Sequence, residues 1–237
     1  MKICFFSDAH GNIDAVNAFF QDIEKRKIDI TIYGGDCFGY FYEVNEVINI
    51  LREKKTMCIL GNHDKMFLDM LDKKIPQQDL CKKYGNTYQG IEDRISESNV
   101  CFLQNLKSEI IIEVDNQRLL FVHGSIDNHI NGRIYPDTQI TNVEEYQAWD
   151  AVFMGHTHHK MKRNVGSCML YNSGSVGQPR DGKGTSYVIY DTSTRCCDFF
   201  TFEYDYNRLI GEIKIRERDN REMEEKLIEL VTRKCLV

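Results

Sequence analysis

Short apolar runs recur along the chain and predict its main strands. Five of them are rich in β-branched and aromatic residues, as buried strands are, and they span residues 3–6, 30–33, 57–60, 119–122 and 151–154. Apolar residues at helical spacing follow the first two runs, over residues 13–23 and 44–51. This alternation of strand and helix predicts an α/β protein whose parallel strands are joined by right-handed crossovers.

The rest of the chain has weaker patterns. Residues 65–105 are charged and lack a strand pattern until about Val100, so we interpret them as helical, either a cap beside a site or a solvated face. Residues 126–148 favour a loop with a short helix. Strands predicted at 168–172, 186–191 and 196–204 follow one another without helices, which indicates a second, partly antiparallel sheet. An apolar stripe over 219–237 predicts an amphipathic C-terminal helix.

Composition restricts the classes of partner and location. The chain of 237 residues is short for two substantial domains, so we expect one domain over 1–237. Its formal net charge is −6 and it has no basic stripe, so a nucleic acid duplex is not expected as a partner. Nine cysteines without a C-x-x-C pair favour a reducing compartment. Because no signal peptide or membrane-spanning apolar stretch is found, we expect a cytoplasmic protein without a membrane partner.

A cluster of Asp, His or Asn follows each of the five apolar runs. The residues that could ligate metal are Asp8, His10, Asp36, Asn62, His123, His156 and His158. Open α/β sheets build their sites where strands end, and this set is too large for one ion. Two ions at roughly 3.5–4 Å could share a bridging ligand. Mixed imidazole and oxygen ligands favour Mn, Fe, Zn, Ni or Co over Mg or Ca.

The motifs Asp-x-His, Gly-Asp, Gly-Asn-His-Asp, His-Gly and Gly-His-Thr-His, in this order, resemble the calcineurin-like metallophosphoesterase superfamily. Residues 35–40 and 172–182 look like its bacterial branch of small phosphodiesterases similar to YfcE. The resemblance implies a four-layer αββα sandwich with mixed sheets. It also implies two ions, with Mn the first expectation, held by Asp8, His10 and His158 and by Asn62, His123 and His156, with Asp36 bridging.

The same resemblance leaves His63 without a metal and directs it at the substrate. It would protonate the leaving alkoxide or stabilise the developing charge, and Asp64 would fix its tautomer and orientation. Arg180 either contacts a phosphate oxygen or lies in a turn that packs near the site. Asn12 either contacts substrate or caps the first helix, and we favour the cap.

We therefore predict a metal-dependent phosphoesterase for small phosphate esters, with diesters favoured over monoesters. A hydroxide that bridges the two ions would attack phosphorus. The alternatives are a dinucleoside polyphosphate hydrolase, a protein phosphatase and a non-catalytic scaffold of the same fold. Residues 34–42 lack the additional arginine of the larger phosphoprotein phosphatases, and the scaffold is disfavoured because His63 and every ligand are present.

Overall fold

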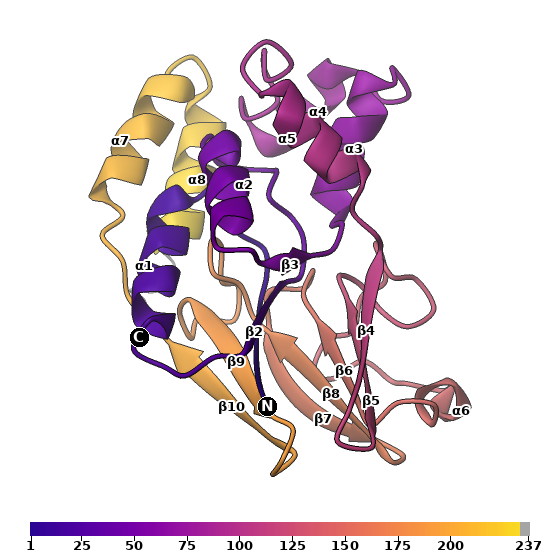
Figure 1. Cartoon of the computed structure of the whole chain (residues 1–237). Coiled ribbons are helices and arrows are strands. Elements are labelled where there is room, and N and C mark those ends of the chain that lie inside the picture. Colours follow the sequence, from indigo (N-terminus) through magenta and orange to yellow (C-terminus); the bar gives the residue numbers. More distant parts are fainter. Residues whose placement is uncertain (233–237) are drawn as a thin grey trace.

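The first of two sheets combines three strands from the start of the chain with two strands from residues 186–201. The structure is a computed structural model that describes residues 1–232 (Figure 1). The spatial order in the first sheet is β10-β9-β1-β2-β3. These strands are β1 (Lys2–Phe6), β2 (Ile30–Tyr33), β3 (Met57–Cys58), β9 (Ser186–Asp191) and β10 (Cys196–Thr201). β1, β2 and β3 are parallel, whereas β9 is antiparallel to β1 and to β10.

The second sheet has the order β4-β5-β6-β8-β7. Its strands are β4 (Glu109–Val114), β5 (Gln117–Val122), β6 (Ala151–Met154), β7 (Lys160–Val165) and β8 (Cys168–Ser173). β5, β6 and β8 are parallel, and each of the edge strands β4 and β7 pairs antiparallel with its neighbour.

The two sheets pack face to face through aromatic side chains. Phe5 of β1 lies 5.7 Å from Phe121 and 6.0 Å from Phe153 between ring centroids. Its neighbour Phe6 points to the other face and stacks on Phe19 of a covering helix, 3.9 Å away. Because β1 is buried on both faces after Lys2, its sequence from Ile3 to Phe6 is continuously apolar instead of alternating.

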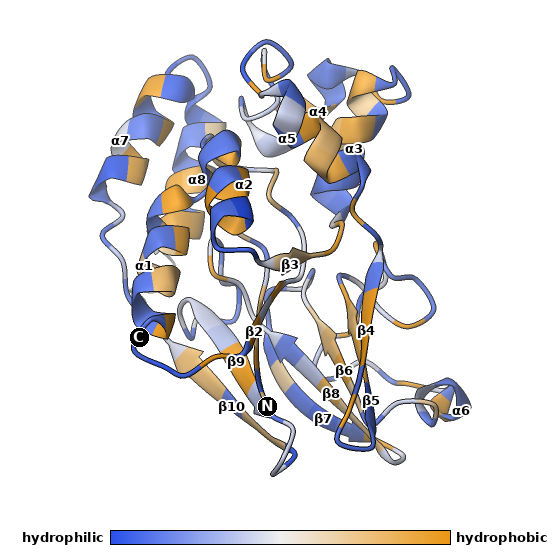
Figure 2. Cartoon of the chain, viewed as in Figure 1, coloured by the Kyte–Doolittle hydropathy of each residue, from blue (hydrophilic) through white to orange (hydrophobic). Residues whose placement is uncertain are grey.

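Helices cover the outer face of the first sheet and the ends of its strands (Figure 1). They are α1 (Ile13–Ile23), α2 (Val44–Glu53), α3 (Asn62–Leu71), α4 (Gln77–Tyr84), α5 (Glu97–Gln104), α7 (Asn207–Arg216) and α8 (Arg221–Thr232). Apolar residues gather on one side of α1 and hydrophilic residues on the other, and the apolar side is the buried one (Figure 2). No helix among residues 1–232 has the length and apolar character needed to cross a membrane.

The outer face of the second sheet is covered thinly. Its apolar residues pack against segment 126–149, which contains only the short helix α6 (Val143–Tyr146). The fold is therefore the predicted mixed α/β sandwich, with a fourth layer made mostly of loop.

One expectation about the elements needs correction, and three elements were not predicted. The strands predicted at 186–191 and 196–204 belong to the first sheet, because β9 occupies the edge of β1 that β2 leaves open. β4, β7 and α7 were not predicted at all. The predicted tail helix is confirmed as α8 over Arg221–Thr232, and the rest of its predicted range, residues 233–237, lies outside the described part of the chain.

Candidate metal centre

The seven candidate ligands come together where the strands of both sheets end. Each is at most 7% exposed. Five have a left-handed backbone, with φ of 61° at Asp8, 50° at His10, 66° at Asp36, 64° at His156 and 59° at His158. Non-glycine residues rarely adopt this conformation, and it lets the chain turn sharply as it leaves a strand. The turns are tied together, since the Asp8 N–H donates to Gly35 O at 3.0 Å.

Asp8, His10 and His158 form a first group of donors. Nδ1 of His10 lies 2.6 Å from the carbonyl oxygen of Phe38, and Nδ1 of His158 lies 2.6 Å from that of Gln178. A carbonyl only accepts, so each ring carries its proton on Nδ1 and a lone pair on Nε2. The two Nε2 atoms are 3.1 Å apart, and Asp8 Oδ1 lies 3.2 Å from Nε2 of His158. Lone pairs that face one another in this way fit a cation between them.

Asn62, His123 and His156 form a second group. Nδ1 of His123 is held 2.8 Å from the carbonyl oxygen of Gly34, which turns Nε2 inward, where loss of its proton frees a lone pair for metal. That Nε2 lies 3.0 Å from Asn62 Oδ1 and 3.2 Å from His156 Nδ1. Oxygen and nitrogen acceptors therefore converge here as well, and this donor set suits a transition metal.

Asp36 lies between the two groups. Its Oδ2 is 3.8 Å from Nε2 of His10 and 3.4 Å from Nε2 of His123, so one oxygen faces both. Its Oδ1 accepts from the His63 N–H at 2.8 Å, which fixes the carboxylate. Only glycine fits at position 61, because a Cβ there would lie 2.2 Å from Asp36 Oδ1.

Burial and mutual charge set the protonation of these groups. Burial lowers the pKa of His10, His156 and His158, that of His156 to about 3, so these rings are neutral, the form that binds metal. Burial also lowers the pKa of His123, but the Asp36 carboxylate outweighs it and raises that pKa to about 9. Burial raises the pKa of Asp36 to about 6.

His63 is buried beside the first group, and its partner differs from the predicted one. Its ring centroid is 5.0 Å from that of His10, and its Nδ1 lies 3.1 Å from the hydroxyl of Tyr88. The Asp64 carboxylate, expected to orient His63, instead accepts from the backbone N–H groups of Asp36, Cys37, Phe38 and Gly61 at 2.8–3.2 Å. The reason is that Asp64 stands in the first turn of α3, where a carboxylate reaches free backbone donors.

Arg180 and Asn12 have different positions relative to the centre. The Arg180 guanidinium is half-buried and donates to Tyr40 Oη at 3.0 Å, and the Tyr40 ring lies 5.4 Å from that of His63. Asn12 is fully buried and accepts from the Ala15 N–H at 3.1 Å. Asn12 is therefore the N-cap of α1, which confirms the capping interpretation.

Sequence reasoning missed three residues that border the centre. Tyr84 and Tyr88 belong to α4 and the segment after it, and the ring of Tyr84 packs 4.5 Å from that of His63. Arg133 donates through Nε to Nε2 of His156 at 2.9 Å. The sequence offered one signal for the two tyrosines, namely that they are aromatic residues within the otherwise charged segment 65–105. This segment contacts the site at His63.

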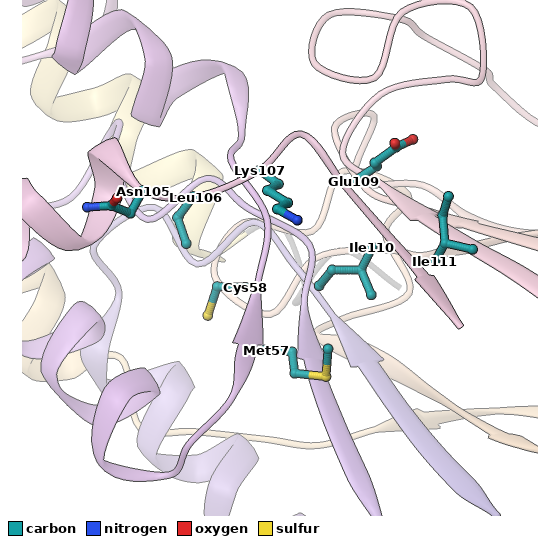
Figure 3. Close-up of a pocket in the computed structure, with 8 residues that line it drawn as sticks. All are labelled: Met57, Cys58, Asn105, Leu106, Lys107, Glu109, Ile110 and Ile111. Carbon is teal, nitrogen blue, oxygen red and sulfur yellow. The ribbon is translucent and has the colours of Figure 1, made fainter. Parts of the chain in front are cut away.

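A separate surface pocket lies where β3 and β4 approach each other (Figure 3). It has a volume of 550 Å³, and two of its lining residues, Met57 and Ile111, are each 42% exposed. None of the candidate ligands lines it.

Comparison with known proteins identifies the family. The chain matches the calcineurin-like phosphoesterase superfamily domain over residues 1–195, and it belongs to this superfamily. It is 29% identical over 229 residues to the uncharacterized protein MJ0912 of Methanocaldococcus jannaschii, covering 89% of this chain and 91% of that protein. Membership makes the chain a hydrolase of phosphate esters and implies divalent metal ions, for which the two groups supply donors.

Two solved structures share the fold. The hypothetical protein PH1004 of Pyrococcus horikoshii OT3 has a TM-score of 0.75 and 19% identity, covering 95% of this chain and 97% of that one. YfcE, a phosphoesterase from E. coli, has a TM-score of 0.51 and 18% identity, covering 86% of this chain and all of the other.

Proposed function

We propose that this chain is a phosphodiesterase that works with two divalent transition-metal ions. The observation that carries the proposal is the pair of converging lone-pair groups that share Asp36 Oδ2, at 3.8 Å from His10 and 3.4 Å from His123. Two neighbouring sites joined by one carboxylate are the arrangement that clamps both sides of a displacement at phosphorus.

The ligand assignment follows the two groups. Asp8, His10 and His158 would hold the first ion, Asn62, His123 and His156 the second, and Asp36 both. The mixed nitrogen and oxygen set suits Mn, Fe, Zn, Ni or Co, and Mn is our first choice. When bound, two such ions polarise phosphoryl oxygens and lower the pKa of coordinated water. Their charge of +4 exceeds that of the two carboxylates, so an acidic protein can still attract a phosphate anion.

His63 is the residue that we assign to the leaving group. One of its ring nitrogens lies within 4.8 Å of ligand atoms of His10 and Asp36. Burial, followed by nearby histidines and Arg180, holds the pKa of His63 well below its usual range. The ring is therefore neutral, and we assign to it a hydrogen bond that stabilises charge on the departing oxygen.

Diesters are preferred in this proposal because of the likeness of segments 35–40 and 172–182 to small bacterial phosphodiesterases. A protein phosphatase is less consistent with the sequence, since no arginine occurs in residues 34–42. The proposed substrate is a small phosphate ester, and the proposed location is the cytoplasm.

The test compares bis-p-nitrophenyl phosphate with p-nitrophenyl phosphate, using metal-stripped protein with Mn, Ni, Zn or Mg added back. We expect metal-dependent turnover that is faster on the diester. His63→Ala should lower kcat by about 100-fold or more, as loss of a hydrogen-bond donor to the developing charge does, while the variant still binds two ions. The control is His129→Ala, which removes a half-buried histidine 3.4 Å from Glu109.

The outcomes separate the alternatives. No turnover of either ester with any metal would support a non-catalytic scaffold. Unchanged activity in His63→Ala would remove the role assigned to that residue.

A further inference from the structure

The pocket between β3 and β4 gathers apolar side chains that solvent can reach. Among residues 1–232 three large apolar side chains are exposed, and two of them, Met57 and Ile111, line this pocket. Leu106 and Ile110 add half-buried apolar surface beside them (Figure 3). Single exposed apolar residues are common on protein surfaces, but their concentration in one hollow of 550 Å³ indicates a binding site for an apolar group.

The pocket exists because the edges of the two sheets separate at this point. β3 is an edge strand of the first sheet and β4 is an edge strand of the second. A bridge between Ile59 and Lys107 joins them, and the Leu60 N–H donates to Lys107 O at 2.8 Å. Beyond this contact β4 pairs with β5 and leaves β3. The backbone of Lys107 is therefore fixed at the end of the pocket, where the two strands diverge.

Lys107 places one positive charge in this apolar hollow. Its amino group points toward the space between Met57 and Ile110 (Figure 3). Among residues 1–232 its ammonium has no hydrogen bond and no ion pair. Glu109, the other charged residue of the lining, points away from that space, and its carboxylate lies 3.4 Å from Nδ1 of His129. The pocket thus combines apolar walls with a single unpaired cationic donor.

We propose that this pocket binds a small organic carboxylate with an apolar body. The carboxylate accepts from the ammonium of Lys107, and the apolar body covers Met57 and Ile111. One ammonium satisfies a monoanion, whereas a phosphate dianion would keep unpaired charge beside apolar walls. The volume lies within the range of small-molecule sites, about 300–1,000 Å³. None of the seven candidate metal ligands lines the pocket, so its occupant is distinct from the phosphate ester of the proposed function.

The charge of Lys107 determines which ligand the pocket should prefer. Octanoate, octanol and octylammonium have the same chain and differ in charge, so the ratio of their dissociation constants measures the charge contact alone. Octanoate should bind about 10-fold more tightly than octanol, as one charge-assisted hydrogen bond contributes. Octylammonium should bind more weakly than octanol, because its charge repels that of Lys107.

The experiment follows the ¹³C-labelled methyl group of Met57 by NMR while each ligand is titrated into the full chain, with and without Zn²⁺. Lys107→Met removes the charge and keeps an unbranched side chain, so it should abolish the preference for octanoate while octanol still binds. Lys107→Arg should keep the preference. Ile111→Ser should weaken the binding of octanoate and octanol alike. Its matched control is Ile215→Ser, which replaces an isoleucine that is 64% exposed on α7, outside the pocket.

A preference for octanoate that is lost in Lys107→Met, kept in Lys107→Arg and Ile215→Ser, and equal with and without Zn²⁺ supports the proposal. The proposal is overturned if octanoate at about 10 mM leaves the Met57 methyl signal unchanged, or if octanoate and octanol bind equally well. Binding of octanoate that requires Zn²⁺ also overturns it, because the carboxylate would then bind at the metal centre. Sedimentation with phosphatidylglycerol vesicles without binding of free octanoate would identify the pocket as a membrane contact instead.

The test does not depend on turnover. A protein without phosphoesterase activity that still prefers octanoate would retain this site and lose the proposed function. An active enzyme whose pocket ignores the charge of the ligand would retain the proposed function and lose this site.

Discussion

His63 is held from two directions by residues of two separate loops. Its backbone N–H donates to Asp36 at 2.8 Å, and its Nδ1 lies 3.1 Å from the Tyr88 hydroxyl. Tyr88 is fully buried, and its ring lies 6.0 Å from that of Phe38. The hydroxyl can therefore fix which ring nitrogen of His63 faces the metal centre, which makes Tyr88 a positioning residue.

Tyr88→Phe tests this role. Only the hydroxyl is removed, so kcat should fall about 10-fold, the value of one buried hydrogen bond, while KM and the number of bound ions stay the same. Steady-state kinetics and metal analysis provide the measurement. Tyr84→Phe is the matched control, since its ring also packs on His63, at 4.5 Å. Equal losses in both variants would contradict a special role for the Tyr88 hydroxyl.

At the scale of elements, the sequence predicts the strands that are buried on both faces of a sheet and misses strands that lie at a sheet edge. β1 is apolar from Ile3 onward and β6 is apolar throughout, so their patterns stand out. β7 reads KMKRNV and carries exposed charges, as edge strands do, so its pattern resembles a loop. The sheet to which β9 belongs depends on contacts with β1 that no local pattern records.

The same distinction holds for the site. Ligands such as Asp8 and His123 directly follow buried strands, which is why the sequence predicts them. Tyr88 and Arg133 reach the centre through loops whose paths depend on tertiary hydrogen bonds. The difference between the predicted and the observed partners of Asp64 has a similar cause. Three of its four backbone donors, those of residues 36–38, become its neighbours only once the chain has folded.

The segment that carries Tyr88 is anchored by an element outside the matched family domain. Glu217, at the end of α7, is fully buried. Its Oε1 accepts from the Asn86 N–H at 2.7 Å and from the Tyr42 hydroxyl at 2.9 Å. Thr87 adds a hydrogen bond to Phe41 O at 2.5 Å. α7 thereby contributes to the site indirectly, through the segment next to His63.

Removal of this anchor should therefore affect stability and catalysis together. For Glu217→Ala we expect the free energy of unfolding to fall by about 2–3 kcal/mol, because two buried hydrogen bonds to a carboxylate are lost. Turnover should also fall, while metal binding is retained. Urea unfolding and kinetics provide the measurements. Glu212→Ala, which removes a pair with Arg216 on the same helix, should cost about 1 kcal/mol or less. A variant with native stability and activity would refute the anchoring role.

At the scale of the whole molecule, the site couples stability to pH. Burial lowers the pKa of four histidines, namely His10, His63, His156 and His158. In the unfolded chain they titrate near a pKa of about 6.5, so below this pH the unfolded state binds more protons. His123 and Asp36, with raised pKa values of about 9 and about 6, act in the opposite direction. Their protonated forms stabilise the folded state at low pH, and this stabilisation is lost as the pH rises through those pKa values.

We expect the four histidines with lowered pKa to dominate the pH dependence of the free energy of unfolding. Between pH 7.5 and 5.5 the free energy of unfolding of metal-free protein should fall by roughly 2–4 kcal/mol, since each pKa unit corresponds to about 1.4 kcal/mol. Urea unfolding at the two pH values measures it. Added Mn²⁺ should stabilise the protein more at pH 7.5 than at pH 5.5, because protons compete for the ligands. A metal-free protein that is more stable at pH 5.5 would contradict this account.

The left-handed backbone at five of the seven candidate ligands has a consequence for the history of such chains. Each of these conformations costs a non-glycine residue of order 1–3 kcal/mol, and glycine would relieve the cost at every one of the five positions. A descendant that gave up its ions would become more stable by replacing these aspartates and histidines with glycine. Mutational drift after loss of catalysis would therefore erase the centre quickly. We therefore expect related chains to keep aspartate and histidine at these five positions only where the centre still holds metal.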